Sequence, residues 1–504
     1  MRLHRNYKSP LIVIITLVII FSVGCGRSTS ANGDDYYVIT PPTQAAPDGE
    51  DQPEASQAPP EENPDAASAR YQLDDPDIVE LMQSRSHAIP LYEAAQLFYY
   101  LDKSFDKDNG AIWGIPLHAP IMFYDLETLE LVANRPDPDG ILEQVGGLYL
   151  GILPNDLMLF DGVVSYLNFG GERWIMSPWA SVDGLNMSFE LSTLSHKAFH
   201  WHQPAFLGEL RLSDNSHMNE IEARISIRLE INALITALRR GGDAGLAAIN
   251  DALAIRAERR RIFDRKAEEN SFELIEGLAH YIEWSFELER EGNVLGTQLI
   301  DAYRMYTDGV VRGDNLERMY GYVSGSLYAF LLDEADPSWM QEVTGNSDLG
   351  TMLKDAIGIT TLPQIDDIDL EQYGYTVIAA QERTWARERD SVIEQIKESL
   401  ANDPLLKFSY DHVEIEGWTI HGQWFTFPNF GGVSRGNSQL IGNFGSLSVT
   451  NGDLILSDIE GAFMIVVFDI EIEDGWASGS NWVLELNDGF GVERDGKDFI
   501  VKRT

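Results

Sequence analysis

The spacing of hydrophobic residues changes along the chain and separates a helical region from two regions of short strands. From about residue 187 to residue 403, apolar residues recur at helical spacing, most clearly in Ile221–Arg240 and Leu246–Lys266. Before this region, short apolar runs such as Pro120–Tyr124 and Arg173–Met176 are separated by Gly, Asp and Pro. After it, Val413–Ile420 alternates apolar and polar residues. The pattern predicts an α+β fold, with a mainly helical domain, a small antiparallel sheet and a C-terminal all-β domain.

The same pattern places individual elements. We expect one helix over Asp77–Phe105, followed by strands that include Ile112–Ile115 and Leu157–Phe160. In the C-terminal domain, which we expect to be a sandwich or a barrel, Asn451–Gly452 and Asp495–Gly496 are typical of hairpin turns. The remaining helices are predicted at Phe272–Arg290, Thr297–Asp308, Leu316–Leu332 and Val377–Leu400.

The first 25 residues resemble a bacterial lipoprotein signal peptide. Basic residues precede the apolar run Leu11–Val23, which is too short to span a bilayer comfortably. The run ends in Ser-Val-Gly-Cys, which resembles the lipobox, where a small residue precedes a Cys that is lipidated. Ser22 stands where that motif usually has Leu. An ordinary cleaved signal and an uncleaved anchor are the alternatives.

The cysteine count supports the lipobox. Cys25 is the only cysteine, so an exported chain can form no internal disulfide. A thiol found only after an export signal is most simply a lipid attachment point, and its acyl chains would hold the protein at a membrane without spanning it. We therefore predict export to the extracytoplasmic side of the cell membrane, with the lipid bilayer as a partner through acylated Cys25.

Composition divides the rest of the chain. Residues 26–75 are rich in Pro, Ala and acidic residues and cannot bury a core, so they predict a disordered tether. The predicted regions are the signal peptide 1–25, the tether 26–75, the main domain 76–404 and the β-domain 405–504. Within the main domain, the β-rich part covers about 110–182 and the helical part about 187–403.

The net charge limits the partners of the folded body. The chain has 80 acidic and 37 basic residues, for a net charge of -43. Such a surface repels the phosphates of nucleic acids and the headgroups of anionic lipids. We therefore expect no nucleic acid partner.

Two short stretches carry the candidate chemistry. In Ser195–Gln203, His196 and His200 are four residues apart, so a helix places both imidazoles on one face. That spacing suits two ligands of one zinc ion, although such a pair alone is a weak signal. The second stretch, Glu276–Ala279, reads Glu-Gly-Leu-Ala and adds a carboxylate next to a glycine.

Together these stretches resemble the zincin-like metallopeptidases of the gluzincin type. The first stretch, through Gln203, is similar to the H-E-x-x-H-x-x-Q helix of bacterial members, and the second to their later E-G-L-A helix. The resemblance covers roughly residues 112–343. It implies a zinc ion held by His196, His200 and Glu276, and an edge strand near the active helix that pairs with an extended peptide or protein substrate.

One departure from the family pattern affects catalysis. Lys197 stands where the family has the Glu that acts as general base, and a protonated Lys has no acceptor. A strongly depressed Lys pKa, or Glu273 or Glu283, would be needed to replace that base. His280 is either a fourth ligand, which would make the site structural, or a hydrogen-bond partner.

Further candidates and two functional hypotheses follow from the resemblance. Tyr320 and Tyr322 are candidate oxyanion donors, with core packing as the alternative. The first hypothesis is a membrane-anchored lipoprotein of zinc metallopeptidase ancestry, degenerate or altered in its chemistry. The second is a non-catalytic surface protein that uses the retained scaffold to bind a peptide, a glycan or a partner protein.

Overall fold

The computed structural model describes residues 70–154, 165–179, 187–208, 210, 215–290, 316–427, 431–457, 461–473 and 475–504. The expected signal peptide with Cys25, nearly all of the tether, the strand at Leu157–Phe160 and the helix at Thr297–Asp308 lie outside these residues. The described part mixes helix and sheet, with a helical region and a nearly closed C-terminal sheet. Among its helices, none combines the length and apolar character that crossing a membrane requires.

The N-terminal helical segment is broken in two rather than continuous. Asp75 caps the first helix by accepting from the backbone amides of Asp77 and Ile78. The second helix begins directly after Pro90, whose ring disfavours helical backbone in the residue before it. The single helix expected over Asp77–Phe105 is therefore wrong. The two helices are α2 (Pro76–Ser84) and α3 (Leu91–Asp108).

A six-stranded sheet follows, in the order β3-β4-β2-β1-β6-β5. β1 and β6 run parallel, with Ile121 opposite Ile175, while the other neighbours are antiparallel, so the sheet is mixed and not purely antiparallel as expected. Its central strands are buried on both faces. Ile112–Ile115 forms turns and no strand. The strands are β1 (Ile121–Tyr124), β2 (Glu130–Ala133), β3 (Glu143–Val145), β4 (Leu148–Ile152), β5 (Ser165–Phe169) and β6 (Glu172–Pro178).

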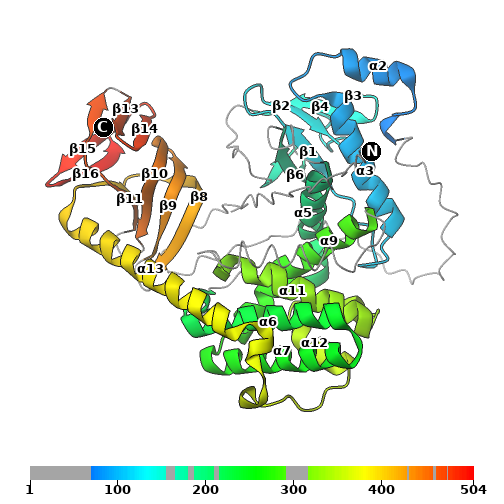
Figure 1. The fold of residues 1–504 in the computed structure, drawn as a ribbon. Helices are drawn as coiled ribbons and strands as arrows, with labels where there is room; N and C mark the ends of the chain where they lie inside the picture. The colour runs from blue at the N-terminus through cyan, green and yellow to red at the C-terminus, as the bar shows by residue number, and fades with distance from the viewer. Residues whose placement is uncertain are drawn as a thin grey trace, which may run out of the picture.

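Helix α5 (Met187–Leu207) packs beside this sheet, as does α3 (Figure 1). The Trp201 indole donates to the backbone oxygen of Arg173 in β6 at 3.1 Å. The Tyr166 hydroxyl of β5 donates to the backbone oxygen of Lys197 at 3.0 Å. Both bonds tie α5 to the last two strands of the sheet, so the helix that carries the histidine pair is fixed against the edge strand β5.

The helical region carries the second candidate stretch, Glu276–Ala279. Its described helices are η1 (Ser216–Asn219), α6 (Ile221–Arg240), α7 (Gly242–Phe263), α8 (Lys266–Phe272), α9 (Leu278–Arg290), α11 (Leu316–Ala335), η3 (Trp339–Glu342), α12 (Leu349–Ala356), η4 (Ile365–Asp367) and η5 (Leu370–Tyr373). α6 confirms the predicted bounds Ile221–Arg240, and the predicted Leu316–Leu332 lies within α11. Between α8 and α9 lies η2 (Glu273–Gly277), a π-helical turn inside the segment predicted as one helix.

Glycines let the η2 turn approach α11 closely. A Cβ added to Gly277 would lie 2.6 Å from the backbone oxygen of Gly321 and 2.6 Å from the Cα of Gly325. A Cβ added to Gly325 would in turn lie 2.7 Å from the backbone oxygen of Glu273. These are contacts between main chains, which a side chain cannot relieve by rotating. The crossing therefore requires glycine on both helices.

Helix α13 (Tyr375–Asn402) joins the helical region to the C-terminal sheet (Figure 1). Near its start, Glu382 is paired with Arg224 and Arg228 of α6, and the Arg224 guanidinium lies 3.6 Å from the centre of the Trp385 ring. Near its end, Ile396 packs into a core cluster formed by strands of the C-terminal sheet. One helix thus packs against both parts of the protein.

The C-terminal sheet has ten strands, most of them antiparallel, with β7 and β16 running parallel. Asp495–Gly496 forms the expected hairpin turn between β15 and β16. Asn451–Gly452 instead lies within β10 at an irregularity of its pairing with β9, so the expected turn there is wrong. The strands are β7 (Leu405–Ser409), β8 (Ile415–Phe427), β9 (Gly431–Gly442), β10 (Gly445–Ser457), β11 (Ala462–Val466), β12 (Glu471–Glu473), β13 (Trp476–Gly479), β14 (Trp482–Leu486), β15 (Phe490–Asp495) and β16 (Asp498–Arg503).

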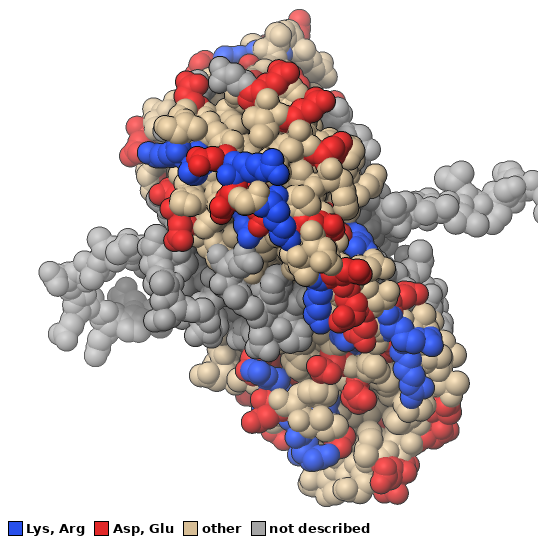
Figure 2. All heavy atoms as spheres, turned by 90° about the vertical axis from the view of Figure 1, so that its left-hand side faces the viewer, with Lys and Arg blue, Asp and Glu red and all other residues tan. Residues whose placement is uncertain are grey.

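Charge is mixed on the face that includes this sheet. Figure 2 shows acidic and basic side chains interspersed there, with neither sign covering the face alone. The large net negative charge of the chain is therefore not gathered into one acidic patch on this face.

The glycine crossing leads to a stability prediction. In an ordinary helix, Gly→Ala stabilises by up to about 1 kcal/mol through helix propensity. Because the added Cβ of Gly277→Ala meets backbone atoms, we expect a loss of about 1–3 kcal/mol in the free energy of unfolding instead. Denaturant unfolding measures the sign, and a stabilised variant would show that the two helices do not meet at this position.

Candidate metal centre

Helix α5 places the two histidines of the first stretch side by side. The Nε2 atoms of His196 and His200 lie 3.0 Å apart, and each residue is 7 % exposed. The two residues are one helical turn apart, so both imidazoles project from the same side of α5. The four-residue spacing therefore places both imidazoles on one face of the helix, as the sequence predicts.

The η2 turn brings the third group to this pair. Glu276 Oε2 lies 3.2 Å from His200 Nε2 and 3.5 Å from His196 Nε2. The Glu276 side chain is mostly buried, at 12 % exposed. His196, His200 and Glu276 thus offer one ligand atom each, all within 4.8 Å of one another. The predicted set is brought together.

Gln203 determines which nitrogen of His200 carries the proton. The Gln203 side-chain nitrogen donates to the backbone oxygens of Leu274 and Ile275, at 2.9 and 3.0 Å. Its Oε1 is therefore the atom that lies 3.0 Å from His200 Nδ1, and an amide oxygen can only accept. His200 consequently has its proton on Nδ1, and the lone pair of Nε2 faces Glu276.

His280 belongs to a neighbouring group. The Trp284 indole, which can only donate, is bonded to His280 Nε2 at 2.9 Å. In the neutral ring the proton is then on Nδ1, which lies 3.0 Å from Glu283 Oε2. Glu283 also lies 3.3 Å from His196 Nδ1. These contacts favour the hydrogen-bond role for His280 over the role of fourth ligand, with Glu283 supporting the imidazole of His196.

The charges of the cluster are set by its burial and its partners. Burial alone would raise the pKa of Glu276, but the charge of His200 and hydrogen bonds with both histidines hold it well below its usual range. Burial lowers the pKa of His200, although Glu276 partly offsets this. Burial also lowers the pKa of His196, but bonds to Glu276 and Glu283 raise it overall. An ionised carboxylate therefore lies against the two imidazoles in a site that is largely shielded from water.

Lys197, the residue after His196, lies beside this cluster. Burial lowers the pKa of its ammonium, while the carboxylates of Glu276 and Glu283 raise it and partly offset the effect of burial. The backbone oxygen of Lys197 accepts from Tyr166 of the edge strand. The residue thus connects the site with β5.

The two candidate tyrosines lie in different places. The ring of Tyr322 stacks on His196, with centroids 5.9 Å apart and an interplanar angle of 8°. Tyr320 points elsewhere: its hydroxyl donates to Asn215 Oδ1 at 2.7 Å and its side chain is fully buried. Tyr322 is therefore a neighbour of the candidate metal centre, whereas Tyr320 is part of the core.

Sequence reasoning named most of the residues around the cluster but not the contacts that they make. Gln203 belongs to the stretch that carries the histidine pair, but its link to two backbone oxygens depends on the approach of η2 to α5. The bond from Trp284 to His280 has a signal in their four-residue spacing, which places them on one helical face. The contact between Glu283 and His196 joins two helices and leaves no local signal.

Comparisons with known proteins found no match: no family model, no curated protein and no solved structure resembles the chain closely enough to identify it.

The hydrogen bonds predict the tautomers of two histidines. In metal-free protein at mildly alkaline pH, we expect the neutral rings of His200 and His280 to carry their protons on Nδ1. Long-range proton–nitrogen NMR correlations on histidine-labelled protein distinguish the two tautomers. Trp284→Phe removes the donor to His280 Nε2. The preference of that ring should weaken but not vanish, because Glu283 still accepts at Nδ1, while His200 should keep its preference unchanged. A proton on Nε2 of wild-type His200 would contradict the assignment.

Proposed function

We propose that the protein binds one zinc-type divalent ion through His196 Nε2, His200 Nε2 and Glu276. One observation carries this proposal: the ligand atoms are separated by 3.0, 3.2 and 3.5 Å. Bonds of about 2.0–2.1 Å in a tetrahedral site put neighbouring ligand atoms roughly 3.3 Å apart. The three distances bracket that value.

The electronic character of these atoms supports the same proposal. The His200 lone pair and the ionised Glu276 face each other inside the protein. Two electron-rich groups held together away from water are costly unless a proton or a cation lies between them. The contacts of the Glu283 carboxylate with His196 and of the Gln203 amide oxygen with His200 also match the outer contacts that orient histidine ligands in metal sites.

We propose a zincin-like metallopeptidase ancestry, and the resemblance of these residues to that family is what supports it. A bound zinc ion would supply Lewis acidity to a carbonyl group. The chain's own contribution would be the edge strand β5, tied to the active helix through Tyr166 and Lys197, along which an extended peptide could pair. These features favour a peptide or protein as the molecule that the site recognises.

We further propose that hydrolysis by the usual route is lost or altered. Lys197 replaces the general base, and the two carboxylates that could substitute for it are engaged. Glu283 is bonded to His280 and paired with His196, and although burial raises its pKa, these histidines hold it well below the usual range. Glu273 accepts from Arg256 and Ser324. A carboxylate with so low a pKa or so many donors is a weak base.

Attachment to a membrane remains part of the proposal. The basic start, the apolar run and the single Cys25 support export and lipidation on the extracytoplasmic side. The alternative function, a non-catalytic surface protein that binds a peptide, a glycan or a partner protein, shares this anchor and differs in needing no metal.

The metal proposal is tested by elemental analysis of the purified chain. We expect about one zinc per chain, removable by chelation, with a lower melting temperature after removal because zinc binds only the folded state. His200→Gln should lose the ion, whereas His202→Gln should keep it. His202 is the matched control, because it lies on the same helix and bonds to the backbone oxygen of His118 instead. A metal-free wild type that also rejects added zinc would refute the proposal.

The lost general base is tested by restoring it. We expect Lys197→Glu to gain peptidase activity that wild type lacks, and to bind zinc more tightly because a positive charge is removed. Lys197→Gln removes the charge without adding a base, so it should gain affinity only. Cleavage of peptide libraries followed by mass spectrometry measures the activity. If wild type cleaves and Glu276→Ala does not, the protein is an active hydrolase after all.

A further inference from the structure

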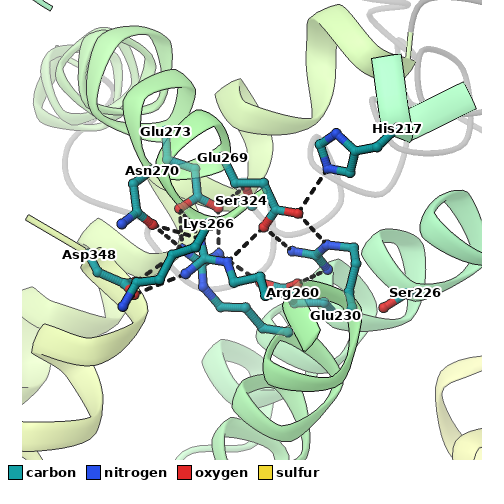
Figure 3. Close-up of polar contacts among 12 residues, drawn as sticks. His217, Ser226, Glu230, Arg260, Lys266, Glu269, Asn270, Glu273, Ser324 and Asp348 are labelled. Carbon is teal, nitrogen blue, oxygen red and sulfur yellow. Dashed lines mark hydrogen bonds and ion pairs between the residues drawn. The ribbon is translucent and has the colours of Figure 1, made fainter. Parts of the chain in front are cut away.

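A buried network of charges includes Glu273, the first residue of the η2 turn (Figure 3). Three arginines of α7 meet carboxylates from other helices: Arg256 and Arg259 both contact Glu230, and Arg259 and Arg260 both contact Glu269. Most of these side chains are almost completely shielded from water. We call these residues, together with Glu273, the Arg–Glu network.

Glu273 is the member of this network that belongs to η2. It is fully buried, and its Oε1 accepts from Arg256 at 2.6 Å and from the Ser324 hydroxyl at 2.7 Å. Its second oxygen is also bonded to Arg256, so the guanidinium holds the carboxylate with two bonds. Arg256 comes from α7 and Ser324 from α11. The first residue of the turn is therefore fixed to two other helices.

Glu276 is three residues further along the same turn. Residues three apart lie about 60° apart around an α-helix, close to one another on one face. The π-helical turn, closed by the bond from the Leu278 amide to the Glu273 oxygen, is wider and increases that separation. Glu273 therefore reaches the Arg–Glu network while Glu276 reaches the histidines of α5.

The turn is held from the other side as well. Gln203, whose oxygen accepts from His200, donates to the backbone oxygens of Leu274 and Ile275 within η2. The backbone that carries Glu276 is thus fixed between helix α5 and the Arg–Glu network. A displacement of Glu273 would move this backbone relative to His200.

We propose that Glu273, held by Arg256 and Ser324, is a positioning residue for the candidate metal centre. It fixes the π-helical turn and thereby the direction and depth of the Glu276 carboxylate. The inference rests on the proposed metal binding, and it assigns to part of the Arg–Glu network a role beyond holding the helices together.

The test compares two equivalent changes within the network. Arg256→Lys removes the bidentate pair of hydrogen bonds to Glu273 but keeps the positive charge. Arg259→Lys is the matched control: it lies one turn away on α7, is equally buried, and bonds to Glu230 and Glu269 but not to Glu273. The full chain is loaded with Co²⁺, whose visible absorption reports ligand geometry, and Zn²⁺ affinity is measured by competition with a chelating dye.

We expect Arg256→Lys to weaken Zn²⁺ binding by roughly 10–100-fold and to change the Co²⁺ spectrum. Arg259→Lys should lower the melting temperature by a similar amount but leave the affinity within about 3-fold of wild type, because Arg259 bonds to Glu230 and Glu269 and not to Glu273 of η2. Equal effects of the two variants on affinity, or no effect of either, would overturn the positioning role. A wild type that binds neither ion would refute the proposed function itself, and the positioning role with it.

A milder pair of variants applies if Arg256→Lys does not fold. Ser324→Ala removes one hydroxyl donor to Glu273, and Ser326→Ala removes a buried hydroxyl of the same helix that donates to the backbone oxygen of Tyr322. We expect only Ser324→Ala to change the Co²⁺ spectrum and to weaken Zn²⁺ binding. An unchanged spectrum and affinity in Ser324→Ala would count against the proposal.

Discussion

The main chains of η2 and α11 lie in direct contact, and the arrangement around the histidine pair depends on that contact. Gly277 and Gly325 have no side chains to separate the two helices, and a Cβ at either position would meet backbone atoms. Because the helices are this close, Glu273 reaches Ser324 on one side of the turn, and Glu276 reaches His200 on the other. A larger residue at the crossing would have to move one of these groups away from its partner.

Buried polar groups are costly unless they are hydrogen-bonded, and around η2 the bonded groups form a continuous series. Gln203 connects His200 to the backbone of η2, and Arg256 connects the first residue of η2 to α7. Breaking one buried ion pair typically costs about 3–5 kcal/mol, because an uncompensated charge is left behind. The Arg–Glu network therefore makes the position of the turn specific, whatever its net contribution to stability.

The same contacts limit what chemistry the cluster can perform. The two carboxylates considered as a substitute base, Glu273 and Glu283, already accept from arginine, serine or histidine. The Lys197 side chain, when protonated, has no lone pair with which to accept a proton. We therefore regard metal binding and recognition of an extended chain as the better supported part of the proposed function. Hydrolysis would require a base, and Glu283, a carboxylate that lies against His196, is already bonded to His280.

Local pattern determined a large part of this protein. The four-residue spacing was enough to place His196 and His200 on one face, and hydrophobic periodicity was enough to place α6. The role of Glu276 as a ligand was predicted from the resemblance of its stretch to a family motif rather than from spacing. Tertiary structure alone decided the π-helical turn, the tautomers of His200 and His280, and the placement of Tyr320 in the core. It also placed Asn451–Gly452 within a strand instead of a turn. The reason is physical: periodicity and motifs report which face of an element is buried, whereas these features depend on atoms contributed by elements distant in the sequence.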